Sequence, residues 1–306
     1  MPQNHFVDSE AEMRERIRQN RLRSRLYTAA ALLFMVFFLV FAICGVSLLV
    51  QTIREYREEK AFENLIGMVG TDAADVPEIP ETSPSMPDDT TPASGPEPTV
   101  APSAPPDATG PGEPVILDKY LSLYELNNDL FGWISIDGTD LNYPVMKTPD
   151  DEEFYLRRGY DKKYSRSGVP FLDKDCTVEG KNFIVYGHNM FNGTMFSLLE
   201  SYSEEAFWKE HPTISFDTLY EEGEYQVVSA FYSRVFYQYE TNVFRYYDYD
   251  DLSDPQDYAD YVAWMTKQAL YDTGVKIEED DQLLTLITCS YGSEHERFIV
   301  LARKVS

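Results

Sequence analysis

The chain has 306 residues, of which 43% are hydrophobic and 14% aromatic, so it can form one sizeable folded domain with extensions. Its formal net charge of −26 argues against a nucleic-acid-binding function, because so acidic a surface repels phosphates. Its three cysteines are too few for a secreted disulfide scaffold.

The N-terminal part has the pattern of a membrane anchor. Residues 27–50 carry no charge and, at about 1.5 Å per residue, reach roughly 36 Å, enough for the ~30 Å hydrocarbon core. Six arginines precede this stretch, and the positive-inside rule places the basic tail, residues 1–26, in the cytoplasm. We expect a single-pass signal anchor in the cell membrane with the remainder outside. A cleavable signal peptide is the alternative, but the apolar stretch is too long for one. Lipidation at Cys44 is disfavoured by the bulky Ile43 before it.

Two segments separate this anchor from the folded domain. Residues 51–70 continue as a charged juxtamembrane helix. Residues 71–114 contain twelve of the eighteen prolines, several acidic side chains, and no Lys or Arg. This composition cannot bury a core and predicts a disordered linker, with a reach on the order of 130 Å if it is extended. We interpret it as a spacer between the membrane and an extracellular domain.

The folded domain, residues 115–306, has the pattern of a mainly β protein. Apolar spacing predicts a helix over residues 118–129 and helical insertions at 196–209 and 257–271. Apolar runs between Asp-Gly and Gly turns predict strands at 132–136, 141–146, 168–172, 182–186, 213–216, 225–232, 283–288 and 298–302. So many short strands are typical of a β-barrel or a β-sandwich.

Three side chains have the chemistry of a thiol acyl-transfer site. Cys289 ends an apolar run and Arg297 stands at the start of the next, so neighbouring strands would bring them together. A nucleophilic thiol needs a nearby base, and His188, just after another apolar run, is the candidate. The guanidinium supplies donors for the oxyanion that forms at the attacked carbonyl.

Other interpretations of these residues remain open at this point. A cysteine that closes an apolar strand is often a small buried hydrophobic residue. His295 follows Cys289 closely and competes with His188 as the base. A disulfide between Cys176 and Cys289 would abolish a thiol mechanism, but Cys176 lies in a polar, turn-like segment and we expect no such bond.

Metal and cofactor chemistry has little support in the sequence. No pair of Cys or His residues has the spacing of zinc ligands. The acidic run over residues 248–254 lacks the ordered spacing of an EF-hand calcium loop. We therefore expect no metal and no cofactor.

The candidate residues lie in motifs that resemble a known family. The run Thr285-Leu286-Ile287-Thr288-Cys289 with the later Arg297 resembles the TLxTC…R signature of sortases, and Val185-Tyr186-Gly187-His188 resembles the segment that carries their catalytic histidine. The sequence Asn192-Gly193-Thr194-Met195-Phe196 and the predicted helix at 257–271 are similar to class B sortases in particular. The resemblance covers most of the C-terminal domain, whereas the long Pro-rich linker departs from the short stem usual in the family.

The resemblance implies an eight-stranded β-barrel with peripheral helices and a cysteine transpeptidase activity. Cys289 would attack the Thr carbonyl of a C-terminal sorting motif to form a thioester, His188 would transfer protons, and Arg297 would stabilise the oxyanion. By position, the residues implied to line the motif groove are Leu156, Phe244, Ile287 and Thr288.

The implied partners are surface proteins with a C-terminal sorting motif and an amine acceptor on the outer face of a Gram-positive cell membrane. The acceptor would be a lipid-linked peptidoglycan precursor or a pilin lysine. Two rival functions remain: a membrane-anchored cysteine hydrolase, in which water replaces the amine, and a catalytically silent surface interaction domain.

Overall fold

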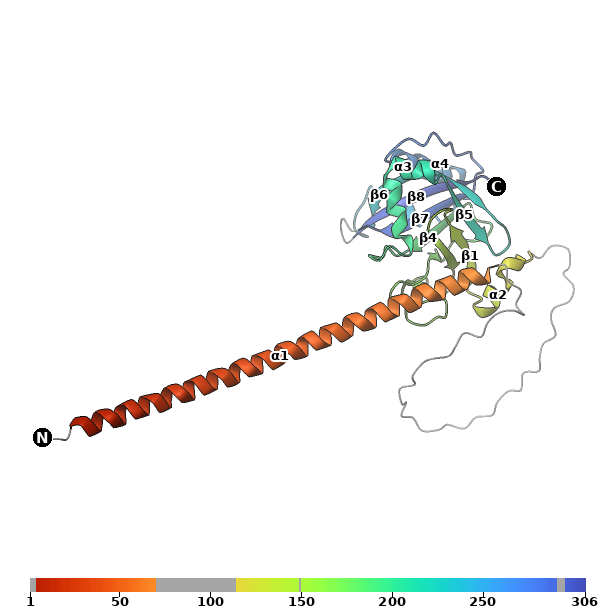
Figure 1. The fold of residues 1–306 in the computed structure, drawn as a ribbon. Helices are drawn as coiled ribbons and strands as arrows, with labels where there is room; N and C mark the ends of the chain where they lie inside the picture. The colour runs from red at the N-terminus through yellow and green to blue at the C-terminus, as the bar shows by residue number, and fades with distance from the viewer. Residues whose placement is uncertain (1–3, 70–113, 149, 291–294) are drawn as a thin grey trace, which may run out of the picture. The chain divides into compact units, whose positions relative to one another are not determined.

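The computed structural model describes residues 4–69, 114–148, 150–290 and 295–306 (Figure 1). Nearly all of the predicted Pro-rich linker lies outside the described residues. The chain divides into two compact units, residues 1–60 and 61–306. Each unit is described by itself below.

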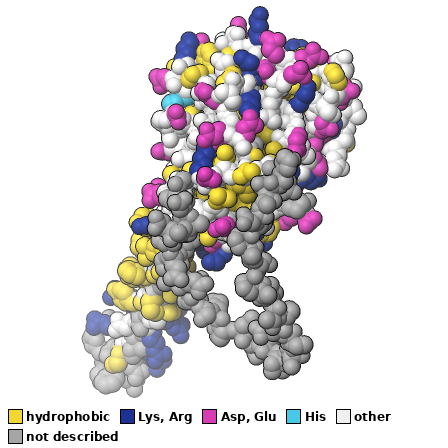
Figure 2. All heavy atoms as spheres, turned by 90° about the vertical axis from the view of Figure 1, so that its right-hand side faces the viewer, with side chains coloured by type: hydrophobic (Ala, Val, Ile, Leu, Met, Phe, Trp, Pro, Cys, Tyr) yellow, Lys and Arg dark blue, Asp and Glu magenta, His cyan; other side chains and the backbone are white. Residues whose placement is uncertain are grey.

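The first unit consists of most of one long helix, α1 (Asn4–Met68). An apolar part of this helix is long enough to cross a membrane, and none of it is buried within the protein. Figure 2 shows hydrophobic side chains along the helix and dark blue Lys and Arg side chains toward its N-terminal end. The helix is therefore a candidate membrane span by length and composition.

The second unit is organised around a sheet that contains all eight strands found in the described residues. The strands are β1 (Leu130–Ser135), β2 (Asn142–Met146), β3 (Phe171–Leu172), β4 (Asn182–Gly187), β5 (Thr213–Thr218), β6 (Glu224–Arg234), β7 (Leu283–Cys289) and β8 (Glu296–Lys304). Their order is β1-β2-β3-β4-β7-β8-β6-β5, and β5 pairs with β1, so the order closes on itself. The pairs β2–β3 and β4–β7 are parallel, and the others are antiparallel. The expected fold is confirmed at the level of an eight-stranded sheet with helices.

The central strand β7 is buried on both faces until its last residue. Helix α4 (Pro255–Lys267) contacts this strand through Tyr261. The hydroxyl of Tyr261 on this helix lies 2.8 Å from Thr285 Oγ1, and Thr285 donates to Asn182 Oδ1 at 3.0 Å. Asp254 begins the helix because its carboxylate accepts the backbone N–H groups of the first turn, directly before a proline.

The remaining helices of the described residues are short. They are α2 (Asp118–Leu126), η2 (Phe154–Arg157), η3 (Phe196–Ser203), α3 (Glu205–Glu210) and η4 (Tyr246–Asp248). Helix α2 precedes β1, and the others lie in connections between strands. Helix α2 ends before the predicted residue 129 because Asn127 turns into an extended conformation. Its side-chain amide then donates to Tyr155 Oη and to the carbonyl of Tyr160, at 2.8 and 2.7 Å.

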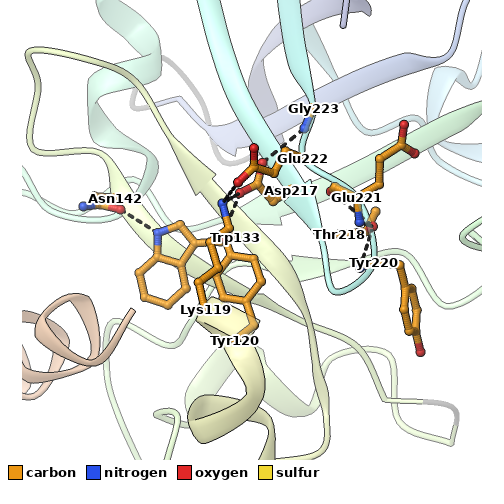
Figure 3. Close-up of polar contacts among 10 residues, drawn as sticks. All are labelled: Lys119, Tyr120, Trp133, Asn142, Asp217, Thr218, Tyr220, Glu221, Glu222 and Gly223. Atoms are coloured by element: carbon orange, nitrogen blue, oxygen red, sulfur yellow. Dashed lines mark hydrogen bonds and ion pairs between the residues drawn. The ribbon is translucent and has the colours of Figure 1, made fainter. Parts of the chain in front are cut away.

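A polar cluster attaches α2 to the sheet (Figure 3). Lys119 Nζ lies 2.7 Å from Asp217 Oδ2 and 2.5 Å from Glu222 Oε1. Tyr120 also donates to Asp217 Oδ2 at 2.6 Å, and Gly223 N–H donates to Oδ1 of the same carboxylate. A half-buried carboxylate with these donors is well satisfied, so the cluster fixes α2 against β5 and the turn that follows it.

The core of the second unit also includes the last turns of α1. Phe62, Leu65 and Met68 recur every three residues and are 9%, 6% and 7% exposed. The ring of Phe62 packs edge-on against Tyr143 on β2, with ring centroids 5.4 Å apart. The unit that contains the sheet therefore begins at Ala61, before the linker, and not only at residue 115.

Candidate active site

Strand register brings the three predicted catalytic residues to one end of three adjacent strands. Cys289 on β7 is paired directly with Arg297 on β8. On the other side of β7, Thr288 is paired with Gly187 of β4, and His188 is the next residue. Adjacent strands lie about 4.8 Å apart and paired residues share a face of the sheet. Cys289 therefore lies between the strand ends that carry His188 and Arg297. Figure 1 shows β7 between β4 and β8.

Cys289 occupies the position where its strand leaves the core. It is an exposed residue with a free thiol, whereas the six residues before it in β7 are buried. The alternative interpretation of Cys289 as a small buried hydrophobic residue is therefore wrong. A thiol at the accessible end of a rigid strand can meet a substrate without exposing the core.

His188 is half-buried and held by one defined contact. Its Nε2 lies 2.9 Å from the carbonyl oxygen of Leu156, which can only accept, so Nε2 carries the hydrogen and Nδ1 has the lone pair in the neutral ring. Burial is the main cause that lowers the pKa of His188 below its usual 6.5, and the Arg157 guanidinium also lowers it. The hydrogen bond to Leu156 opposes this shift without reversing it.

The Arg297 guanidinium lies beside the cysteine strand. Its Nη1 donates to the carbonyl of Glu296 at 2.9 Å. The same carbonyl accepts the backbone N–H of Ser290 at 3.0 Å. The backbone N–H directly after Cys289 is thus already engaged, whereas the guanidinium carries five N–H donors, of which Nη1 supplies the one in this contact.

The competing histidine, His295, lies toward a different strand. Its backbone carbonyl accepts from Val235 N–H just after β6, and its ring Nε2 lies 2.8 Å from Tyr237 Oη. The His295 and Tyr237 rings pack edge-on with centroids 5.0 Å apart. His295 is therefore held on the β6 side of β8, away from β4.

The predicted groove residues fall into two groups. Leu156 and Phe244 are partly buried, and Leu156 contacts His188 through its carbonyl. Ile287 and Thr288 are only 3% and 1% exposed, and Thr288 Oγ1 donates to the Gly187 carbonyl at 2.8 Å. The burial of Ile287 and Thr288 favours support of the site over direct substrate contact, and contact through Leu156 and Phe244 stays a prediction.

Two residues that the sequence analysis did not select lie at this site. Asn189 Nδ2 donates to the Cys289 carbonyl at 2.9 Å. Tyr246 is buried, its hydroxyl has no hydrogen-bond partner among the described residues, and burial raises its pKa. The charges of Arg297 and Cys289 also act on Tyr246. The sequence does not single out either residue, because Asn189 is recognised only by its contact with Cys289 and Tyr246 is one of several neighbouring tyrosines.

The other cysteine in this unit has a different environment. Cys176 is fully buried and free, and its Sγ accepts the Ile184 N–H at 3.4 Å. Burial raises the pKa of its thiol to about 12. Among the described residues, no three His, Cys, Asp or Glu side chains form a group that fits a metal ion.

Comparison with known proteins identifies the family. The family model of the sortase domain matches residues 134–305. Sortase B of Listeria monocytogenes is 33% identical to this chain over 184 residues, which cover 60% of this chain and 71% of that protein. Sortase B of Staphylococcus aureus is 31% identical over 189 residues, which cover 60% of this chain and 74% of that protein.

Solved structures agree with this result. A Staphylococcus aureus sortase B–substrate complex superposes with a TM-score of 0.55 at 28% identity, covering 62% of this chain and 86% of that one. Clostridium perfringens sortase B superposes with a TM-score of 0.54 at 27% identity, covering 60% and 98%. The expected family resemblance is confirmed: the chain belongs to the sortase family, and its relatives in these comparisons are sortase B proteins.

Proposed function

We propose that this protein is a membrane-anchored cysteine transpeptidase that cleaves a C-terminal sorting motif after Thr and transfers the acyl group to an amine. The observation that carries the proposal is the placement of His188, Cys289 and Arg297 on three adjacent strand ends. Membership in a family of cysteine transpeptidases supports the same chemistry.

The first half-reaction forms the thioester. Cys289 Sγ attacks the Thr carbonyl while its proton passes to His188 Nδ1, and the carbonyl π electrons move onto the oxygen. The Arg297 guanidinium donates to this oxyanion. When the intermediate collapses, the C–N bond breaks and the departing amine takes the proton from His188. The motif remains bound through its carbonyl to sulfur.

The second half-reaction reverses the roles. The incoming amine attacks the thioester carbon and gives its proton to His188, and the C–S bond breaks as the thiol is regenerated. The low pKa of His188 suits both steps, because the free ring is neutral near pH 7 and its protonated form is a strong proton donor. In the alternative function as a hydrolase, water replaces the amine in this step.

The substrate and acceptor follow by analogy with relatives. One related structure is a sortase B–substrate complex, and another is a sortase B complexed with triglycine. We infer a sorting-motif protein as acyl donor and a lipid-linked peptidoglycan precursor or a pilin lysine as amine donor. Leu156, whose carbonyl contacts His188, and Phe244 are the residues whose side chains we expect to contact the motif.

The same proposal includes the location of the enzyme. The uncharged stretch over residues 27–50 and the arginines before it support an anchor with a cytoplasmic N-terminus and an external catalytic domain. A membrane-impermeant maleimide applied to intact cells tests the orientation. We expect it to label Cys289, and protection of Cys289 until the cells are lysed would contradict an external site.

The activity is tested with a panel of peptides that carry Pro-x-Thr-Gly or Pro-x-Thr-Asn motifs, together with an amine acceptor. Mass spectrometry should detect an amide product and an acyl group on Cys289. We expect Cys289→Ala and His188→Ala to abolish transfer with the fold intact. His295→Ala and Cys176→Ala are the matched controls and should retain it.

The products separate the remaining functions. Hydrolysed peptide without amide product, across several amines, would favour the hydrolase. A Cys289 that forms no acyl intermediate with any peptide and does not react with thiol reagents would favour the silent interaction domain. Near-normal transfer by His188→Ala would refute the assigned mechanism.

A further inference from the structure

We infer that Asn189 is a positioning residue for Cys289, which it fixes through the peptide group on the C-terminal side of the nucleophile. The inference rests on the proposed function, because it concerns how that cysteine is held. The observation that supports the inference is the hydrogen bond from Asn189 Nδ2 to the Cys289 carbonyl, which is 2.9 Å long.

The peptide between Cys289 and Ser290 is held from both sides. Its carbonyl accepts from the Asn189 side chain, and its N–H donates to the Glu296 carbonyl at 3.0 Å. The Glu296 carbonyl also accepts from Arg297 Nη1 at 2.9 Å. One peptide plane therefore connects the segment after His188 to the segment that carries the guanidinium.

Asn189 acts where the strand ladder ends. The pairing of β4 with β7 runs to Gly187 and Thr288, so no further strand pairing of β4 is available to hold Cys289. The side-chain amide of Asn189 supplies a donor at this point, in place of a backbone N–H. It thereby extends the contact between β4 and β7 by one more residue, at the nucleophile itself.

The segment that carries Asn189 is itself anchored. Asn189 forms an isolated bridge with Met195, and Phe196 N–H donates to the His188 carbonyl at 2.8 Å. The buried Met195 N–H donates to Tyr143 Oη on β2 at 3.1 Å. Because the turn after His188 is closed on itself and attached to the sheet, the Asn189 amide is a fixed donor.

A fixed peptide plane at Cys289 limits where the sulfur can lie relative to His188 and Arg297. Misplacement of a reacting atom by about 1 Å can cost on the order of 100-fold in rate. Loss of the Asn189 hydrogen bond should therefore reduce the rate of acyl transfer more than it reduces substrate binding or stability.

The test compares wild type, Asn189→Ala, Asn189→Asp and Asn192→Ala in the full chain in detergent micelles. Asn192 is the matched control because its side chain bonds to Thr194 and not to Cys289. For Asn189→Ala we expect kcat to fall about 10- to 100-fold, with KM within about threefold of wild type and little change in Tm. Asn192→Ala should behave as wild type.

Asn189→Asp preserves the shape of the side chain but replaces the donor with a negatively charged acceptor. We expect a larger fall in kcat than for the alanine variant. We also expect the pH midpoint for alkylation of Cys289 by iodoacetamide to move upward, because a nearby negative charge disfavours the thiolate. A purely space-filling role predicts that the aspartate variant keeps the wild-type kcat, because the shape of the side chain is preserved.

The outcomes separate failure of this inference from failure of the proposed function. Wild-type kcat in Asn189→Ala, or a loss of activity that only follows a loss of folded protein, would overturn it. If even wild type transfers no peptide, the proposed function fails. The pH midpoint for alkylation of Cys289 then still tests whether Asn189 lies beside Cys289. An upward midpoint in Asn189→Asp would then support the contact with Cys289, and an unchanged one would overturn it.

Discussion

Gly187 is the position where a single methyl group should disturb the site most directly. It is the last residue of β4 and precedes His188. A Cβ at this position would lie 2.5 Å from two ring atoms of Phe196 and 3.0 Å from a third. Phe196 is fully buried, so its ring cannot move into solvent to make room. Gly187→Ala should therefore force a shift of either the strand end or the ring.

The cost can be worked out from this geometry. Ordinary contacts begin near 3.4 Å, so the ring of Phe196 must move by about 1 Å. Overpacking a core in this way costs about 1–3 kcal/mol, offset by the ~0.5–1 kcal/mol by which Ala is favoured over Gly in a strand. We expect Gly187→Ala to lower the free energy of unfolding by about 1–2 kcal/mol, or roughly 3–6 °C in Tm.

The assay is urea unfolding of residues 61–306 for wild type, Gly187→Ala, Phe196→Leu and the double variant. Leucine at position 196 removes ring atoms that the added methyl would meet. The cost of Gly187→Ala should therefore be smaller in the Phe196→Leu background, with a coupling free energy of about 0.5–2 kcal/mol. Strictly additive costs, or wild-type stability of Gly187→Ala, would refute the reasoning.

Three further predictions concern packing, thiol chemistry and pH. A Cβ on Gly132 would lie 2.0 Å from the backbone oxygen of Asp217, so Gly132→Ala should cost about 3 kcal/mol or more in urea unfolding; a cost below about 1 kcal/mol would contradict this. Iodoacetamide at pH 8 should modify Cys289 in the folded protein but spare Cys176, whose thiol is buried with a pKa raised to about 12. Peptide mass mapping identifies the modified cysteine, and modification of Cys176 but not of Cys289 would contradict this prediction. Because burial lowers the pKa of His188 below 6.5, the unfolded chain binds this proton first, so the His188 contribution to stability is present above pH 6.5 and is lost as pH falls toward the folded pKa. Unfolding at pH 7.5 and 5.0 should show a smaller pH-dependent loss for His188→Gln, and an equal loss would contradict the shift.

Strand positions were well predicted because alternating or continuous apolar runs were bounded by clear turn residues. The main difference is β3, predicted over residues 168–172 but formed only by Phe171 and Leu172. Gly168 has a φ of +63°, outside the extended region, and Pro170 has no N–H for a ladder. Local chemistry at these two residues thus overrides the apolar pattern.

The candidate site was predicted only in part, and the reason is again physical. Cys289, His188 and Arg297 were recognisable because each follows or begins an apolar run and because their motifs resemble a family. Asn189 was not, because its role depends on a contact with a residue a hundred positions away. The choice between His188 and His295 likewise depends on which strand lies beside β7.

The sequence by itself determined the uncharged helix, the number and approximate positions of the strands, and the residue types of a thiol site. These features depend on short-range periodicity and on side-chain chemistry, which can be read within a few residues. Only the tertiary structure decided that β4 and β8 flank β7, that Cys289 is exposed while Cys176 is buried, and that the second compact unit begins at Ala61. These properties depend on pairing and burial between segments far apart in the chain, which no local pattern specifies.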